Sequence, residues 1–466
     1  MVLREIMDII PGMAYIVDRI EVMSAPGRRR LMSLPWLRDA ESIRRALEAV
    51  GELAAEDSNL ASTKAMDAIR LALMQIKEIK GTAARILQAD RLDDIELFEL
   101  KSFALTAMDL RKALMQTSIT AVSMPDLEPV ADILDPRRAR VPHFYIYDDY
   151  SPELAAVRKR IKALNADGSE EATREAEQLF ITATELEDGI REDLSRQLHA
   201  HADDINEALA QVAQLDVLQA LSRLAASEHL SRPETADRGL RYTGLVNPAV
   251  RAALAQKGKT YQPVDITLRP GATVITGANM AGKSVLLKSA ALAQAMMQFG
   301  IYVPAAEAHV APVDEILLSI GDDQSEMSGL SSYAAEMMRI DTILSRLRSG
   351  IRALVLIDEP ARTTNPVEGL ALVQALTSIL SGYDSTTALT THYSGITVPC
   401  HRLRVKGLGD IPPGTPLRPG DLNRYIDYSL TEEAGDSVPH EAVRIARLLG
   451  VDAELIDKTQ SIIEQN

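Results

Sequence analysis

The sequence predicts a mixed fold, in which an all-α core-and-lever half precedes an α/β half with a parallel sheet and helices on both faces. In the first half, apolar residues recur at the spacing of an amphipathic helix. In the second half, short apolar runs alternate with helical patterns, which is the order that builds a parallel sheet. We therefore expect a helical domain over residues 1–240, an α/β domain over residues 241–430 and a helical tail over residues 431–466.

The helical half begins with patterns such as SIRRALEAVGEL, which places Ile43, Leu47, Val50 and Leu53 at helical spacing. The stretch DAIRLALMQIKEIKGTAARIL repeats this spacing. Prolines then interrupt the pattern, so HFYIYDDY is either a short strand or an irregular connection.

Residues 151–227 return to a long helical pattern, and Gly168 in NADGSE is the expected turn between two antiparallel helices. The sequence thus predicts a long helical hairpin, or lever. Residues 151–230 contain 8 Lys or Arg against 16 Asp or Glu, a net charge of −8 with histidine neutral. A lever of this charge would repel a phosphate backbone at close range.

The α/β half contains four candidate strands, in ATVITG, IYVPA, ALVLIDEP and TTALTTHY. The helix KSVLLKSAALAQAMMQFG follows the first of them, and the tail PHEAVRIARLLGVDAELIDKTQSIIEQ is helical. Apolar runs that end in acids or a polar cluster are typical of buried parallel strands.

Composition narrows the class of protein. The chain has 466 residues, a formal net charge of −16, 4% aromatic residues and one cysteine. A disulfide framework is excluded, and a reducing cytosol fits best. We find no apolar run that could span a bilayer and no secretory signal, so we expect no membrane association. The acidic charge and the few aromatic residues disfavour nucleic acid as a partner.

The stretch TGANMAGKSVLLKS begins at the end of the first strand. It satisfies the pattern G-x-x-x-x-G-K-[ST] from Gly277 to Ser284. Glycines let such a loop curl so that backbone N–H groups and the following helix N-terminus hold an anion. Lys283 adds a positive charge for the outer phosphates, and the Ser284 hydroxyl can bind magnesium. The alternative is a chance match in a glycine-containing loop, but a strand precedes this loop and a helix follows it. The pattern predicts an ATP and Mg²⁺ site.

Two acids follow the apolar run of the strand in LVLIDEP. Asp358 can hold magnesium, and Glu359 can polarise an attacking water. The alternative is a strand that merely ends in acids, and the upstream loop favours the functional interpretation.

Four stretches resemble motifs of the MutS family. VITGANMAGKS resembles the family's T-G-P-N-M-G-G-K-S, from which this chain departs at Ala278 and Ala281. MSGLSSYAAEM resembles its signature segment, DEPARTTNPVEG its D-E-I-G-R-G-T-S-T-x-D-G, and TTHY its A-T-H-Y. The motifs occur in the family's order, and a looser resemblance extends through the helices from about residue 20.

This resemblance implies an ABC-ATPase-like phosphate-loop domain, ATP hydrolysis and a homodimer, with residues 431–466 as a dimerisation tail. It also implies that Ser331 touches the γ-phosphate of the opposing subunit and that His392 senses the γ-phosphate. The predicted catalytic residues are Glu359, His392 and Ser331, and the predicted magnesium residues are Ser284 and Asp358. The predicted nucleotide-binding residues are Gly277, Ala278, Asn279, Met280, Ala281, Gly282, Lys283, Ser284 and Val285.

Simpler interpretations accompany several of these residues. Ser331 could cap the following helix, His392 could be an ordinary histidine at a strand end, and Asn279 could be a turn residue. We interpret Cys400 as a packing residue. The basic clusters at residues 28–30 and 137–140 are interpreted as solvated helix ends or local ion pairs rather than DNA contacts.

Three functions remain open. The wedge motif G-x-F-Y-E of mismatch-repair members does not occur, and the lever tip KALNADGSEEATREAEQLF is too short for their DNA-gripping clamp. We therefore expect a stand-alone ATPase that remodels a protein client. The variant DEPARTTNP resembles the MutS-like subunit associated with reactivating cobalamin-dependent lysine aminomutase. The second hypothesis is a DNA-structure binder in repair or recombination, and the third is a nucleotide-gated scaffold that hydrolyses ATP slowly.

Overall fold

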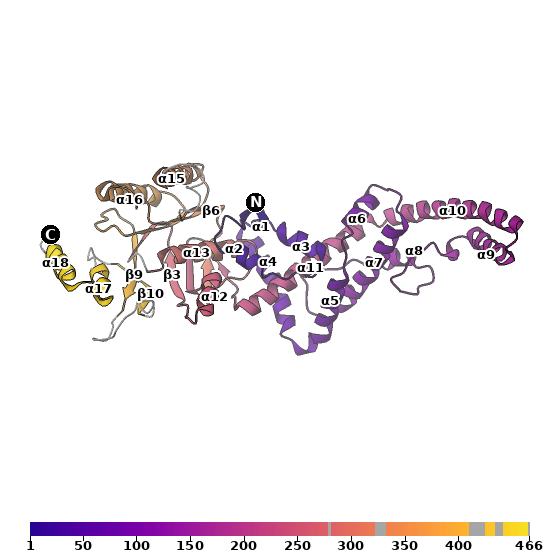
Figure 1. The fold of residues 1–466 in the computed structure, drawn as a ribbon, viewed down its shortest axis with the longest axis horizontal. Coiled ribbons are helices and arrows are strands. Elements are labelled where there is room, and N and C mark those ends of the chain that lie inside the picture. The colour runs from indigo at the N-terminus through magenta and orange to yellow at the C-terminus, as the bar shows by residue number, and fades with distance from the viewer. Residues whose placement is uncertain (278–280, 322–331, 410–424, 434–440, 465–466) are drawn as a thin grey trace. The chain divides into compact units, whose positions relative to one another are not determined.

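The structure is a computed structural model that describes residues 1–277, 281–321, 332–409, 425–433 and 441–464. The chain forms two compact units, of which the first comprises residues 1–19, 35–48 and 224–466 and the second residues 20–34 and 49–223. Figure 1 shows the elements of both units. Within the described ranges, no helix combines the length and the apolar character needed to cross a membrane.

The second unit is built from helices, as the sequence predicts. Its elements are α3 (Ala25–Met32), the later part of α4 (Ala40–Asp57), the 3-10 helix η1 (Leu60–Ser62), α5 (Thr63–Gln75), α6 (Lys80–Leu87), α7 (Asp94–Leu114), α8 (Glu128–Leu134), the 3-10 helix η2 (Asp148–Tyr150), α9 (Pro152–Asp167), α10 (Glu170–His199) and most of α11 (Ala202–Glu228). The stretch HFYIYDDY is irregular up to η2, which decides between the two alternatives left open by the sequence.

The predicted turn of the lever is confirmed. Gly168 has φ 72°, a left-handed conformation that glycine adopts without strain, and it caps the end of α9. The Ser169 side chain then accepts a hydrogen bond from the Ala172 N–H and begins α10. The small side chains Ala172 and Ala176 pack with Leu164 between the two antiparallel helices.

An ionic network fixes the base of the lever within the second unit. Arg191 of α10 pairs with Asp94 at the start of α7 at 2.8 Å and with Asp188 at 2.9 Å. Arg158 of α9 pairs with Glu187 of α10 at 2.7 Å and donates to the Ile146 carbonyl at 2.7 Å. These contacts join both lever helices to their neighbours.

The first unit holds the α/β elements. Its helices are α1 (Leu3–Ile6), α2 (Met13–Val17), the start of α4, the end of α11, α12 (Pro248–Gln256), α13 (Lys283–Gln298), α15 (Ser332–Arg348), α16 (Pro366–Ser381), α17 (Glu441–Leu448) and α18 (Ala453–Glu464). Its strands are β1 (Glu234–Thr235), β2 (Leu240–Leu245), β3 (Val264–Leu268), β4 (Gly271–Thr276), β5 (Glu307–Val310), β6 (Glu315–Ser319), β7 (Ala353–Ile357), β8 (Thr386–Thr391), β9 (His401–Leu408) and β10 (Ile426–Glu432).

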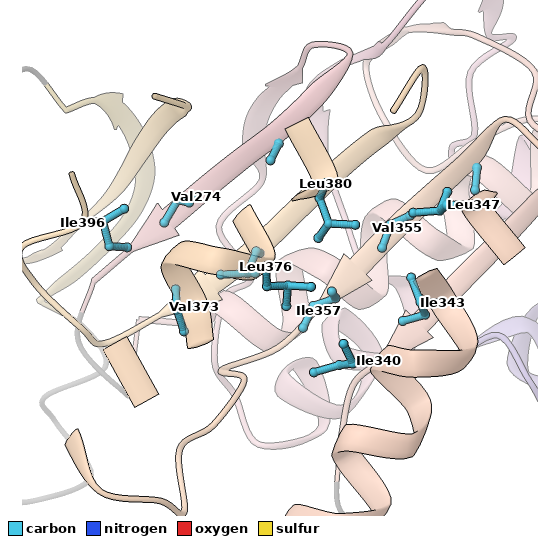
Figure 2. Packing of buried hydrophobic residues seen from close by; sticks show 13 residues of the cluster. Val274, Ile340, Ile343, Leu347, Val355, Ile357, Val373, Leu376, Leu380 and Ile396 are labelled. Atoms are coloured by element: carbon cyan, nitrogen blue, oxygen red, sulfur yellow. The ribbon is translucent and has the colours of Figure 1, made fainter. Parts of the chain in front are cut away.

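The larger sheet has the strand order β10-β9-β4-β8-β7-β6. Neighbouring strands from β9 to β6 pair in parallel, and β10 pairs antiparallel with β9, so the predicted parallel sheet carries one antiparallel edge strand. Every residue of β7 is buried, because α15 and α16 pack on one face and α13 contacts β7 and β8 as well. Figure 2 shows Val355 and Ile357 of β7 against Ile340 and Ile343 of α15 and Leu376 of α16.

A second sheet, of order β1-β5-β2-β3, was not predicted. β2 pairs antiparallel with both β3 and β5. The predicted strand IYVPA is wrong, because only Val303 of that stretch forms a bridge, to Ser231, and the strand β5 begins at Glu307. The polar sequence EAHV at residues 307–310 carried no apolar signal, and pairing with β2 determines its conformation instead.

Candidate active site at the carboxyl edge of the parallel sheet

The predicted site residues follow three adjacent strands. The order β4-β8-β7 places the loop after Thr276, the histidine after Thr391 and the acids after Ile357 at the same edge of the sheet. Since parallel strands bring their carboxyl ends to one edge, segments distant in sequence meet there. This edge is the usual position of ligand sites in open α/β sheets.

The phosphate-loop sequence connects β4 to α13 as predicted. Gly277 has φ 143° and Gly282 has φ 72°, both conformations that side-chain-bearing residues rarely adopt. Gly282 is the N-cap of α13, and Lys283 is its first residue. The Leu286 N–H donates to the Gly282 carbonyl at 3.0 Å, so the helix begins directly after the glycine and directs its N-terminus toward the loop.

Lys283 and Glu359 meet directly. The Lys283 ammonium lies 3.1 Å from Glu359 Oε1, and the two side chains are only 3% and 13% exposed. The same ammonium donates to the Gly277 carbonyl at 2.6 Å. Glu359 Oε2 lies 3.6 Å from Arg362, which the sequence analysis did not single out. Two cations therefore hold the carboxylate that is predicted to polarise water.

Asp358 and Glu359 are connected through Thr390, a residue that sequence reasoning missed. The Thr390 hydroxyl donates to Asp358 Oδ1 at 2.6 Å and accepts from the Glu359 N–H at 3.0 Å. The Asp358 N–H donates to the Ser319 carbonyl of β6 at 2.9 Å. A threonine on the fully buried strand β8 was an available signal, because a buried hydroxyl needs a hydrogen-bond partner.

The backbone after β7 is strained at two positions. Glu359 has φ 45° and Ala361 has φ 60°, both in the left-handed region that non-glycine residues seldom occupy. The Ala361 N–H donates to Glu336 Oε1 of α15 at 3.0 Å, and the Ala361 carbonyl accepts from the Tyr393 hydroxyl at 2.8 Å. These bonds hold the acidic turn in this conformation.

His392 lies just past the end of β8 and is exposed to solvent. Its ring contacts that of Tyr393 with centroids 4.4 Å apart. The position at the sheet edge is the predicted one, while the role of the imidazole stays a prediction.

Several predicted residues lie outside the described ranges. They are Ala278, Asn279 and Met280 of the loop and Ser331 of the signature segment. Their assignments remain predictions. The other predicted nucleotide-binding residues are described: Gly277, Ala281, Gly282, Lys283, Ser284 and Val285.

A pocket of about 640 Å³ opens beside the phosphate loop and was not predicted. Ala281, Gly282 and Val285 line its loop side, while Tyr261 and Tyr428 line the remainder together with aliphatic and polar side chains. Burial raises the pKa of both tyrosines, so their phenols are neutral. The size, the two tyrosine rings and the polar groups beside them suit a flat aromatic ring that also carries hydrogen-bonding atoms.

Tyr428, which lines this pocket, lies in β10 at a register shift between Asp427 and Leu430. Gln262 accepts from the Tyr428 N–H at 3.1 Å and donates to Asp427 Oδ1 at 2.8 Å. Hydrogen bonds from Ser429 and Gln262 hold the pKa of Asp427 well below its usual range. A Cβ placed on Gly282 would lie 3.0 Å from the Tyr428 ring, so glycine permits this approach.

The donor set suits magnesium better than a transition metal. Ser284 and Asp358 offer a hydroxyl and a carboxylate, the hard oxygen ligands that Mg²⁺ takes together with water and phosphate. Within the described ranges, no group of three or more His, Cys, Asp or Glu side chains could hold a metal ion by itself.

The basic cluster at residues 137–140 is engaged locally. Arg137 pairs with Asp149 at 2.5 Å, and Arg138 and Arg140 both pair with Asp132, at 2.6 and 2.5 Å. For this cluster the interpretation as local ion pairs is confirmed.

Comparison with known proteins identifies the same half of the chain. Residues 273–464 match the family model described as MutS domain V. The chain is 34% identical over 318 residues to the DNA mismatch repair protein MutS of Granulibacter bethesdensis, covering 67% of this chain and 32% of that protein. It is 30% identical over 287 residues to the protein of the same name from Dinoroseobacter shibae, covering 60% of this chain and 32% of that protein.

The chain spans about a third of the length of the curated relatives that it matches. The match includes the described ends of the phosphate loop and the acid pair, so residues 273–464 resemble domain V of the MutS family.

Proposed function

We propose that the chain binds ATP with Mg²⁺ and hydrolyses it at the carboxyl edge of the larger sheet. The observation that carries this proposal is the 3.1 Å contact between Lys283 of the phosphate loop and Glu359 after β7. It joins the phosphate-binding and water-polarising elements in one buried site. An ABC-ATPase-like arrangement of this domain is part of the proposal.

Each side chain then has a defined task. Lys283 leaves Glu359 to bind the outer phosphates, and the freed Glu359 carboxylate polarises the attacking water. Ser284 and Asp358 would hold Mg²⁺, which neutralises charge on the phosphates. The adenine ring would occupy the pocket between Tyr261 and Tyr428. His392 as γ-phosphate sensor and Ser331 as a contact across a homodimer complete the proposed site.

The energy of ATP would move the lever of α9 and α10 against a protein client. Residues 151–230, which comprise the lever and α11, have a net charge of −8, which suits a basic protein surface and disfavours a phosphate backbone. A cobalamin-dependent aminomutase, reactivated by release of a spent cofactor, is the client class that we propose.

The first test is steady-state ATP turnover of the purified protein with Mg²⁺. Lys283→Ala should abolish tight ATP binding and reduce turnover by about 10²-fold or more, because the buried cation for the phosphates is lost. Lys288→Ala, on the same helix α13, is the matched control and should turn over normally. Normal turnover by Lys283→Ala would remove this lysine from the mechanism.

The second candidate function is binding of a DNA structure, which the names of the relatives favour. Turnover should therefore be measured with and without duplex or branched DNA at low and physiological salt. A response to DNA that fades with salt would support this candidate. A rate indifferent to DNA, but raised by an aminomutase client, supports the protein-remodelling role.

A further inference from the structure

We infer that the outward face of α10 is a docking surface for a partner protein that presents a basic amphipathic helix. This surface, the α10 face, comprises Glu170, Glu177, Phe180, Ile181, Glu185 and Glu192. The inference deepens the proposed remodelling role and rests on it in taking a protein as the client.

Two large apolar side chains stand in solvent on this helix. Phe180 is 66% exposed and Ile181 is 61% exposed, although the chain contains only five phenylalanines and the other four are buried or half-buried. The packed side of α10, with Ala172, Ala176 and Leu179, faces α9 instead. Phe180 and Ile181 therefore lie mostly outside the lever's own core, and burying their exposed surface against a partner would be favourable.

Carboxylates precede and follow Ile181 along one side of α10, which also carries the exposed Arg174, and Phe180 lies next to that side. Glu177, Ile181 and Glu185 follow at four-residue steps and share one side of the helix, and Glu170 and Glu192 extend that side by two turns in each direction. All four glutamates are exposed, and none has an ion-pair partner in the part of the chain that the structure describes. Along Glu170–His199 three arginines stand against nine acids, a net charge of −6 with histidine neutral.

This charge pattern selects the occupant. A second copy of the chain would bring the same carboxylates against one another, and like charges at close range are repulsive. A nucleic acid backbone would be repelled in the same way. A helix that carries lysine or arginine before and after its apolar residues complements both the glutamates and the neighbouring Phe180 and Ile181.

The α10 face is also held in place at its base. Arg191 pairs with Asp94, Glu187 and Asp188, and Arg158 bridges α9 to Glu187. A preorganised helix loses little conformational entropy when a partner binds, so even a modest contact area gives measurable affinity.

The test uses the full chain and a fluorescein-labelled peptide of about 20 residues, in which leucines at helical spacing are flanked by lysines. A peptide with glutamates in place of the lysines is the control probe. Binding is followed by anisotropy at two salt concentrations, and circular dichroism confirms that each variant keeps its helices. The variants are Phe180→Ser with Ile181→Ser, and Glu177→Gln with Glu185→Gln.

We expect each double variant to raise the Kd of the basic peptide at least about tenfold, because central apolar anchors and complementary charges both contribute. The matched control is Leu71→Ser with Met74→Ser, which removes equally exposed apolar side chains from α5 and should leave the Kd unchanged. Equal binding by all variants, or an equal loss in the control, would overturn the inference. The same variants are also tested with a labelled DNA duplex and by sedimentation. The inference would be overturned if the wild type bound the duplex and these variants did not. It would also be overturned if the wild type sedimented as a dimer and these variants as monomers.

ATP turnover is measured on the same samples. Unchanged turnover with weakened peptide binding supports the docking surface. If no sample hydrolyses ATP while the peptide results hold, the proposed ATPase fails and the docking surface stands.

Discussion

Glu359 is held by Lys283 on one carboxylate oxygen and approached by Arg362 on the other. A carboxylate in this position cannot polarise a water until the lysine moves to another anion. In the proposed function the γ-phosphate of ATP would be such an anion, and Lys283 would then couple binding of the nucleotide to release of the Glu359 carboxylate.

Glu359→Gln should therefore bind ATP and fail to hydrolyse it, since the amide cannot act as a base while Asp358 and Lys283 remain. We expect turnover to fall about 10²- to 10⁴-fold with tight binding retained. Glu368→Gln, an exposed acid in the first turn of α16, is the control. Steady-state turnover together with equilibrium binding of labelled ATP separates the two effects, and normal hydrolysis by Glu359→Gln would show that another group is the base.

Thr390 and Thr387 provide a matched comparison on one strand. Thr390→Val removes the hydroxyl that joins Asp358 Oδ1 to the Glu359 N–H, and leaves both groups without that partner. The expected loss of stability is about 1–3 kcal/mol, with weaker Mg²⁺-dependent ATP binding. Thr390→Ser should restore both properties.

Thr387→Val is the control, because the Thr387 hydroxyl is buried and finds no hydrogen-bond partner in the described residues. That substitution should be neutral or stabilising. Urea unfolding and ATP binding measure both pairs of variants. If Thr387→Val and Thr390→Val changed the free energy of unfolding and the affinity for ATP equally, the hydrogen bonds of Thr390 would have no specific role.

At the scale of elements, the buried pair of Lys101 on α7 and Asp135 after α8 fixes the irregular connection that leads to η2. The two side chains are 0% and 2% exposed and lie 3.2 Å apart. Lys101 also donates to the His143 carbonyl at 2.8 Å and to the Tyr147 hydroxyl at 3.0 Å. One ammonium thereby anchors three points of a segment without regular structure.

This pair predicts a pH dependence. Burial alone would raise the pKa of Asp135, but hydrogen bonds from the Arg140 N–H and from Lys101 hold it below its usual value. A carboxylate whose pKa is lower in the folded state stabilises the fold above its unfolded pKa of about 4, and this contribution is lost as the pH falls through the folded pKa. Asp135→Asn should therefore be less stable than the wild type by about 3–5 kcal/mol at pH 7.

The gap in free energy of unfolding between the wild type and Asp135→Asn should become smaller as the pH falls below about 4, because Asp135 of the wild type then loses its negative charge. Urea unfolding at several pH values between neutral and about 3 measures this gap. Asp132→Asn, at a partly exposed acid on α8, should show a smaller gap at pH 7. A gap that is constant with pH would contradict the role of Asp135 ionisation.

The elements that the sequence predicted well are those with local signals. Gly168 ends α9 in the left-handed conformation, and the apolar run before Asp358 is the fully buried strand β7. The break between α10 and α11, at residues 200–201, was not predicted. Leu198 and Ile205 lie seven residues apart on either side of it, a spacing typical of one continuous helix, and both are buried.

In the candidate site, too, some features have a local sequence signal and others do not. The position of Gly277, Gly282, Lys283, Asp358 and Glu359 at one edge of the sheet could be predicted, because each follows an apolar run that reads as a strand. Their roles in binding phosphate and metal stay predictions. The neighbours that complete the site, Thr390 and the pocket at Tyr261 and Tyr428, depend on which strands lie side by side. β10 carries Tyr428 to the loop through antiparallel pairing with β9, a register that no local pattern encodes.

At the scale of the whole molecule, we propose a homodimer joined by the C-terminal helices. Leu455 and Ile462 of α18 lie seven residues apart on one face and are 58% and 59% exposed. Leu455→Ser with Ile462→Ser should convert a dimer to a monomer in analytical ultracentrifugation. Because Ser331 is proposed to act on the opposing nucleotide, turnover should fall with the dimer.

The control for this experiment is Leu71→Ser with Met74→Ser, which changes exposed apolar side chains of α5 and should leave the sedimentation unchanged. A chain that remains dimeric with both α18 substitutions would place the dimer contact elsewhere. A monomer with undiminished turnover would show that each active site is complete within one subunit.

The division of the first unit along the chain has a consequence for how the protein is made. Residues 1–19 belong to the same compact unit as residues 224–466, and a Cβ on Gly12 would lie 3.2 Å from Leu292. At ~5–20 residues per second, a ribosome needs roughly 15–55 s to proceed from the end of α2 to Leu292. During that interval residues 1–19 lack α13, so Leu3, Ile6, Met13 and Ile16, all of which are buried in the finished protein, have not reached their folded surroundings. The helical unit can complete its folding first, and we expect residues 1–19 to be a target for chaperones until α13 has been synthesised.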